Sequence, residues 1–346
     1  MENYLDLYPE DKITSASFPE NESDIKLLLN GVYAQLREKE VYNQGLFGFG
    51  ITDGATPNAF NWGTDEVFNK LGAGRLSSSD GGVVTYRWKR CYEIISRANY
   101  LLACMDLVDL SEEAKAKYSG ETHFLRGLAY SVLAETYGGV PIILTDISTE
   151  EARSLKRASL EETWQQALDD YEVAITNLGV DAPEPGRATK GAALGMKMRA
   201  YLYQGKYKEV LSCVEQIDAL KKYGLFHSYE GLFDPANENN KEVLFDIQYI
   251  EGENSQGSYI DQYCGTGTGS WTRGSRYVPT DDLVAAYETI DGSPVDPENP
   301  YENRDPRLGF TAVLPGSYFL GYRFPNYLYP GAVSYTHLTL PTNSLV

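Results

Sequence analysis

The sequence predicts a mainly α fold: a tetratricopeptide-like helical scaffold with long loops and minor β segments built on one side. Apolar residues recur at helical spacing through residues 87–221, which indicates packed helices. Two Gly-rich stretches, 40–82 and 251–280, break this pattern and are expected to be long loops. Strand-like alternation is limited to a short stretch after residue 222. At 346 residues the chain is long enough for one large core or two domains.

Three helices are expected to pack through amphipathic faces: 21–38, 87–108 and one that begins at a capping box of Ser159 and Glu162. The first has on one face Ile25, Leu28, Val32 and Leu36. The second has on one face Trp88, Tyr92, Ile95, Asn99 and Leu102. The third carries Leu160, Trp164, Leu168, Tyr171, Ile175 and Leu178. Steps of three and four residues keep each set on one side of its helix, so these faces are expected to be buried.

A long helix is expected after Ser111, a residue type that suits the N-cap position. Its broad apolar stripe comprises Phe124, Leu125, Leu128, Ala129, Val132 and Leu133. Gly138 and Gly139 can adopt the left-handed conformation that ends a helix, and Pro141 cannot continue one. A short extended segment is therefore expected at 140–144.

Two further helices are expected at about 189–204 and 206–221, joined at Gly205. Their connection resembles the turn of a tetratricopeptide repeat, in which Gly lets two helices turn back at close range. In that motif the following aromatic residue, here Tyr207, packs against the preceding helix. An ordinary helical hairpin is the alternative interpretation.

The pattern changes in the last third of the chain. Val243, Phe245, Ile247 and Tyr249 alternate with their neighbours, which predicts a strand. A short helix is expected to start at Pro279 to Asp282 and to run through Tyr287.

Five segments in order carry a family resemblance: Tyr4–Thr14, Tyr92–Leu102, the run GETHFLRGLAYSVLAETYGGVPIIL at 120–144, Gly186–Ala193 and Tyr287–Leu308. Together they resemble the SusD/RagB family over about residues 3–316. The resemblance implies a surface lipoprotein of tetratricopeptide-like fold that binds nutrients for an outer-membrane transporter. It also implies a signal peptide and a lipidated Cys, which this sequence lacks, so the membrane anchor is expected outside the given chain.

The resemblance also sets the expected domain limits. One SusD/RagB-like domain, its N-terminal and central part, is expected over residues 1–333, with the helical-repeat scaffold at about 87–221. Residues 334–346 resemble nothing in the family and are interpreted as a non-native tail, with an authentic short terminus as the alternative.

Charge limits the classes of partner. The chain has 30 Lys and Arg against 49 Asp and Glu, a formal net charge of −19. Nucleic acid is not expected as a partner, because phosphate neutralisation needs a clustered cationic face. Direct docking on anionic lipid is disfavoured for the same reason. Neutral sugars remain compatible with this charge.

No motif for catalysis or metal binding stands out. The sequence has no G-x-S-x-G elbow, no H-E-x-x-H pair and no P-loop. The stretch 291–302 has the length of a calcium loop, but Asp296 replaces the required Gly and three prolines interrupt it. We expect no metal and no cofactor. Zinc-site spacing is absent, and free thiols are expected at Cys91, Cys104, Cys213 and Cys264.

The expected function is non-catalytic binding of an extracellular glycan or a similar oligomeric nutrient. The 27 Tyr, 12 Phe and 4 Trp include flat rings that can stack on sugars, and two long loops can present them. The resemblance adds a SusC-like TonB-dependent transporter as partner, and a lipid-anchored location at the extracellular face of the outer membrane. Two alternatives remain: a helical-repeat scaffold that binds peptides, and a glycoside hydrolase whose carboxylate pair the sequence does not single out.

Ligand contacts are expected from the two loops and not from the helix stripes, whose aromatic residues are committed to packing. Trp62 and Trp271 are predicted to stack on sugar rings, with Tyr277 as a third surface, because each Trp lies among Gly and polar residues. Hydrogen bonds to sugar hydroxyls are predicted from Asp53, Asn58, Asn61, Arg75 and Arg273. The alternative is that each Trp packs against the scaffold and so holds its own loop in place.

Overall fold

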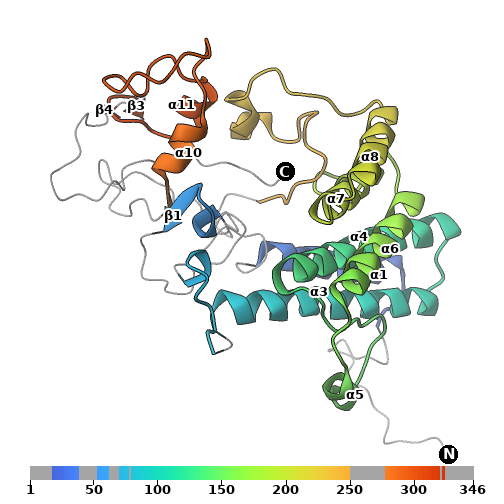
Figure 1. Ribbon diagram of the computed structural model, residues 1–346. Coiled ribbons are helices and arrows are strands. Elements are labelled where there is room, and N and C mark those ends of the chain that lie inside the picture. Colours follow the sequence, from blue (N-terminus) through green and yellow to red (C-terminus); the bar gives the residue numbers. More distant parts are fainter. Residues whose placement is uncertain are drawn as a thin grey trace, which may run out of the picture. The chain divides into compact units, whose positions relative to one another are not determined.

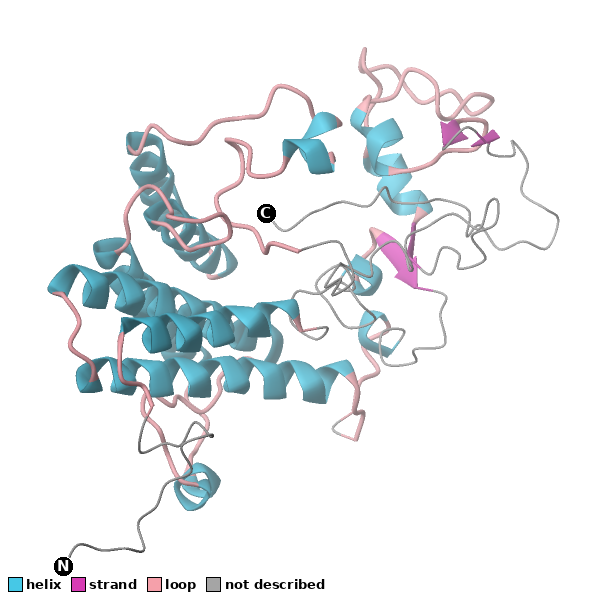
Figure 2. Cartoon of the chain, turned by 180° about the vertical axis from the view of Figure 1, so that it is seen from behind, coloured by secondary structure: helices cyan, strands magenta, loops and turns pink. Residues whose placement is uncertain are grey.

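The computed structural model describes residues 18–38, 53–61, 70–77, 79–249, 277–319 and 322–323. The chain divides into two compact units, one of residues 1–36 and 88–223, the other of residues 37–87 and 224–346. We call them the helical unit and the loop unit and describe each by itself. The mainly α prediction is confirmed, because helices dominate the described residues and the strands are short (Figures 1 and 2).

The helical unit is built from consecutive helices that pack against one another. Its elements are α1 (Glu22–Tyr33), η1 (Ala34–Arg37), α3 (Val83–Cys104, whose first turn belongs to the loop unit), η3 (Met105–Leu107), α4 (Glu112–Tyr137), α5 (Thr149–Ser154), α6 (Leu160–Asn177), α7 (Lys190–Tyr203) and α8 (Tyr207–Ala219). Helix α4 packs against α1 and α6, α6 packs against α7, and α7 packs against α8. In Figure 1, α4 also runs alongside α3, while α5 stands apart.

The core of this unit is the predicted apolar stripe of α4. Each of its six members is at most 4% exposed: Phe124, Leu125, Leu128, Ala129, Val132 and Leu133. Gly127 lets α6 approach closely, because a Cβ at this position would lie 2.9 Å from the Tyr171 ring. Gly138 ends the helix with a φ of 73°, as predicted. Gly139 then passes the carbonyl of Ala158 so closely that a Cβ would lie 2.0 Å from it.

Two details of the predicted helices need correction. In α1 the buried face contains Leu29 and not Leu28, because Leu29 is fully buried and Leu28 only half-buried. At the α7–α8 turn, Gly205 has the expected positive φ of 69°. Tyr207, however, is 67% exposed and does not pack against the preceding helix as predicted. The Gly therefore makes the close turn without the aromatic contact of the tetratricopeptide motif.

The loop unit has short elements. They are β1 (Ala59–Asn61), η4 (Gly231–Phe233), η5 (Pro235–Asn237), β2 (Tyr277–Pro279), α10 (Asp281–Ala286), α11 (Arg307–Thr311), β3 (Tyr318–Phe319) and β4 (Tyr322–Arg323). β1 pairs with β2 and β3 pairs with β4, both antiparallel. A small core joins α10 to α11 through Val284, Leu308, Ala312 and Leu314. The predicted short helix after Pro279 is confirmed as α10, with Thr280 as its N-cap.

The predicted strand at 243–249 is wrong. The backbone of this segment forms no strand, and its side chains are half-buried whichever way the alternation would point them. Alternation in sequence produces a strand only where a neighbouring strand accepts the ladder hydrogen bonds and one face is buried. The alternating residue types here do not correspond to alternating burial.

Two further observations concern the described residues. Cys91, Cys104 and Cys213 are buried and form no disulfide, as predicted, and Cys264 lies outside the described residues. Among the helices described, none is long and apolar enough to cross a membrane.

Candidate ligand-binding site

The two long loops of the sequence meet in one antiparallel ladder. β1 lies within the 40–82 stretch and β2 within the 251–280 stretch. Their register pairs Ala59 with Pro279, Phe60 with Val278, and Asn61 with Tyr277. One segment from each of the two sequence ranges of the loop unit is thereby fixed beside the other, with β1 next to α10 in Figure 1. We call this pair the loop ladder.

Thr280 ties the loop ladder to α10. Its backbone N–H donates to the carbonyl of Asn58 at 3.0 Å, and its hydroxyl donates to the carbonyl of Pro57. The same hydroxyl accepts from the N–H of Leu283 at 3.2 Å, which caps the first turn of the helix. One side chain thus binds the helix N-terminus and the turn that precedes β1.

Three predicted site residues lie near this ladder on exposed turns. Asp53, Asn58 and Arg75 are all exposed. Asp53 and Asn58 flank the short turn that leads into β1, and Arg75 belongs to the neighbouring 70–75 segment. Gly72 brings the two turns together, because a Cβ on it would lie 3.3 Å from the carbonyl oxygen of Gly54. The structure therefore gathers polar groups from two turns beside the ladder.

Partial burial of its carboxyl raises the pKa of Asp53, although the residue as a whole is exposed. Water is partly excluded around the oxygens, which disfavours the charged form. No hydrogen bond from a described residue to this carboxyl is present to offset that cost. Its oxygens can accept hydrogen bonds from donors such as sugar hydroxyls.

Asn61 and Tyr277 form the last rung of the loop ladder, and only their backbones are described. Trp62, Trp271 and Arg273 lie outside the described residues, so the aromatic platform stays a prediction. Sequence reasoning missed Phe60, whose side chain is 40% exposed on β1. The alternation in the run Ala59 to Trp62 was the available signal, since it resembles a short strand.

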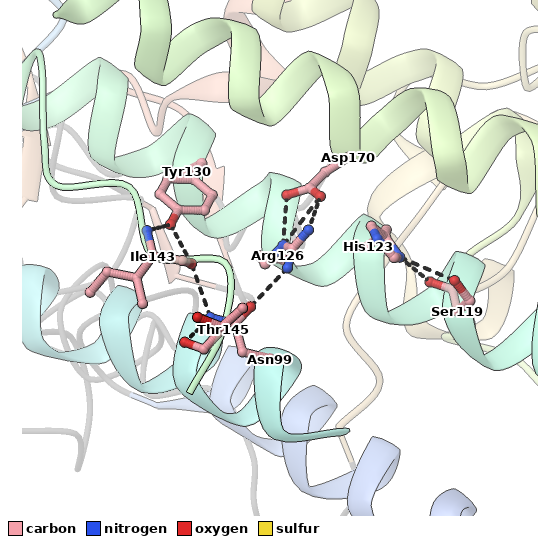
Figure 3. A network of polar contacts seen from close by, with 8 residues as sticks. All are labelled: Asn99, Ser119, His123, Arg126, Tyr130, Ile143, Thr145 and Asp170. Carbon is pink, nitrogen blue, oxygen red and sulfur yellow. Dashed lines mark hydrogen bonds and ion pairs between the residues drawn. The ribbon is translucent and has the colours of Figure 1, made fainter. Parts of the chain in front are cut away.

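The buried polar groups of the helical unit serve the scaffold (Figure 3). Arg126 on α4 donates to Asp170 on α6 through Nε and Nη2, at 2.7 Å for the shortest contact. Its Nη1 donates to Asn99 Oδ1 on α3 at 2.8 Å. Asn99 Nδ2 donates in turn to the carbonyl of Ile143 at 2.9 Å, and Tyr130 also binds the Ile143 backbone. These hydrogen bonds link three helices to the 140–145 segment and pair the buried polar groups.

Burial shifts the pKa values of two residues drawn in Figure 3, Tyr130 and His123. Burial raises the pKa of Tyr130 to about 12, so its hydroxyl stays protonated and donates to the Ile143 carbonyl. Burial lowers the pKa of His123, and its Nδ1 bonds the Ser119 carbonyl oxygen at 2.8 Å within the same helix. No group of three or more acidic, His or Cys residues suited to a metal occurs in the part of the chain that the structure describes.

Comparison with known proteins decides the family. Residues 3–202 match the family described as "Starch-binding associating with outer membrane", and residues 241–343 match the one described as "SusD family". The chain belongs to the SusD family. The second match extends into the 334–346 segment. The limits predicted for the domain and for a non-native tail remain predictions.

Individual relatives agree with this assignment. The SusD-like protein P25 of Formosa agariphila is 27% identical over 301 residues, which are 80% of this chain and 55% of that protein. A SusD-like carbohydrate-binding protein of Bacteroides fragilis has a crystal structure similar to this one, with a TM-score of 0.78 and 29% identity over 87% of this chain and 61% of that chain. Surface glycan-binding protein A of Bacteroides fluxus shares the fold, with a TM-score of 0.67 and 21% identity over 78% and 62% of the two chains. The chain spans little more than half the length of the curated relative P25.

Proposed function

We propose that this protein binds a neutral polysaccharide or oligosaccharide without catalysing its breakdown. Membership of the SusD family supports this, since a relative with 29% identity is named as a carbohydrate-binding protein. The aromatic residues of the loops supply rings of the kind that stack on sugars, and the exposed polar turns supply hydrogen bonds.

The pairing of Asn61 with Tyr277 carries the proposal for the site. Because the ladder is antiparallel, the chain that leaves β1 and the chain that enters β2 are at the same end of it. Trp62 follows Asn61 directly. Trp271 precedes Tyr277 by six residues, and such a length reaches at most about 20 Å. Both tryptophans are therefore connected to the same end of the ladder, which is the arrangement that a shared platform requires.

We further propose that binding occurs at the extracellular face of the outer membrane, where the protein delivers its ligand to a SusC-like TonB-dependent transporter. The matched family is described as associating with the outer membrane, which supports the location. A lipid anchor on the full-length protein would provide the attachment. Copurification of the full-length, lipidated protein with a SusC-like transporter from the same cells tests this partnership, and separate elution of the two proteins contradicts it.

The first prediction concerns the two loop tryptophans. Trp62→Ala and Trp271→Ala, made singly, are each expected to weaken polysaccharide binding by about fivefold or more, because a stacking ring contributes on the order of 1 kcal/mol or more. Affinity electrophoresis against soluble starch, laminarin and xylan measures the binding, and thermal denaturation measures stability. The melting temperature is expected to stay unchanged in both variants.

Trp88→Ala is the matched control, because Trp88 packs in the scaffold against Tyr92 and Tyr137, with ring centroids 5.1 and 5.2 Å away. This variant is expected to lower the melting temperature. If the two loop variants lower the melting temperature as Trp88→Ala does and keep their affinity, each Trp packs against the scaffold to hold its own loop, and the platform is rejected. Release of reducing sugar by the wild-type protein would reject the non-catalytic function.

A further inference from the structure

Arg304 is a buried cation that binds the C-terminal end of α10 through hydrogen bonds. It is 7% exposed, and its Nη2 donates to the carbonyls of Val284 at 2.5 Å and Tyr287 at 2.6 Å. Its Nη1 donates to the carbonyl of Pro300 at 2.6 Å. The C-terminus of a helix carries the negative end of its dipole, which a guanidinium offsets. The Val284 carbonyl also accepts from the N–H of Tyr287 at 3.3 Å, and Arg304 adds a second, charged donor to it.

The backbone around Arg304 adds further hydrogen bonds to the segment that follows α10. Thr289 forms a bridge with Arg304, the N–H of Ile290 donates to the Asn303 carbonyl at 2.9 Å, and the N–H of Asp305 donates to the Glu288 carbonyl at 2.8 Å. Leu308 then enters the small core beside Val284. The segment 303–308 is thus fixed to α10 by hydrogen bonds and by packing.

Helix α10 connects the Arg304 segment to the loop ladder. The helix is only six residues long, from Asp281 to Ala286. Its C-terminal end is held by Arg304, and its N-cap Thr280 binds the backbone at Pro57 and Asn58. A helix this short has little stability of its own, so its orientation depends on the contacts at its two ends.

We propose that Arg304 is a positioning residue for the glycan site: it sets the loop ladder through α10 without touching the ligand. The proposal rests on the proposed function for the identity of the ligand, but its structural part concerns the ladder alone. Arg fits this role better than Lys, because its planar fork reaches three carbonyls at once. Its Nε makes no hydrogen bond to any described residue, so the side chain binds these carbonyls through its two Nη groups alone.

The test compares Arg304→Met, Arg304→Lys and the control Arg307→Met. Arg307 lies on the same segment, but its side chain is 61% exposed and pairs with Asp305 at the surface. Hydrogen exchange measured by mass spectrometry reports on the ladder through peptides covering residues 57–61 and 277–281. Arg304→Met is expected to speed exchange in these peptides by about tenfold while α4 and α6 stay protected, and Arg304→Lys is expected to fall between it and wild type.

Affinity for the starch, laminarin and xylan panel gives the second readout. Arg304→Met is expected to weaken binding of the polysaccharide that wild type binds by about tenfold, with Arg307→Met unchanged. Unchanged ladder exchange in Arg304→Met, or equally faster exchange in α4 and α6, overturns the proposal. If wild type binds none of the three, the proposed function fails on this panel, and the exchange data decide the role of Arg304 separately.

Discussion

Among single residues, Glu121 combines deep burial with incomplete neutralisation. It is 2% exposed on α4, where Tyr33 of α1 donates to its Oε2 at 2.8 Å. Arg187, just before α7, approaches the same oxygen at only 3.5 Å and shares its other donors with Asn30 and Glu184. Burial raises the pKa of Glu121, and the hydrogen bond from Tyr33 and the charge of Arg187 do not cancel that effect. The carboxylate is therefore costly to keep charged in the folded protein.

This geometry predicts how stability depends on pH. Because the pKa of Glu121 is higher in the folded protein than its ordinary value, the folded state binds this proton more tightly than the unfolded state. The resulting stabilisation is fully present below the ordinary pKa and is lost as pH rises through the raised pKa. Glu121→Gln removes the titration, so wild type is expected to lose stability relative to this variant as pH rises. Urea denaturation across a pH series measures the difference.

Glu184→Gln is the control for this experiment. Its carboxylate is half-exposed and paired with Lys26 at 3.0 Å, and these contacts lower its pKa. Its contribution to stability is present above the ordinary pKa and is lost as pH falls through the lowered pKa, the opposite direction. A stability difference between wild type and Glu121→Gln that stays constant with pH contradicts the interpretation of Glu121.

Among the elements, α5 and α6 begin with the same capping box in different surroundings. Ser148 with Glu151, and Ser159 with Glu162, each exchange side-chain and backbone hydrogen bonds at the helix start. Helix α6 lies in the core, where Trp164 and Leu168 are at most 5% exposed. Helix α5 is six residues long and stands apart from the bundle (Figure 1).

The difference in surroundings predicts different effects of the same substitution. Ser159→Ala is expected to lower the free energy of unfolding by about 1 kcal/mol, because α6 unfolds only with the core. Ser148→Ala is expected to leave global unfolding unchanged and to release only the amides of α5, since that helix can open locally. Urea denaturation and hydrogen exchange measure the two effects. Equal losses of global stability in both variants would show that α5 unfolds together with the bundle.

The success of sequence reasoning also divides by element. The helices were predictable because their signals are local: the cap Ser159, the stop at Gly138 and the stripe on α4 all lie within the element they define. The loop ladder was not predictable, because it joins Thr280 to Pro57, which are 223 residues apart in the sequence. The pairing of Arg126 with Asp170 was not predictable for the same reason, since no local feature of the sequence selects Asp170 among the 49 acidic residues.

At the scale of the whole molecule, the net charge of −19 separates two kinds of ligand. A protein with this excess of acidic residues repels anionic polymers at long range, and salt screens that repulsion. A neutral polysaccharide has no charge for the field to act on. Stacking and hydrogen bonds between uncharged groups are short-range and depend little on ionic strength.

The proposed function therefore predicts that polysaccharide affinity is nearly independent of salt. Between about 0.05 and 0.5 M NaCl the Debye length falls from about 14 to about 4 Å, so any long-range charge effect is largely removed over this range. The dissociation constant, measured by isothermal titration calorimetry, is expected to change by less than about twofold. Trp62→Ala serves as the control, because it is expected to bind weakly at every salt concentration. Binding that tightens strongly with salt would indicate an anionic glycan. Binding that weakens strongly would indicate a local cationic site, and either result would reject a neutral ligand.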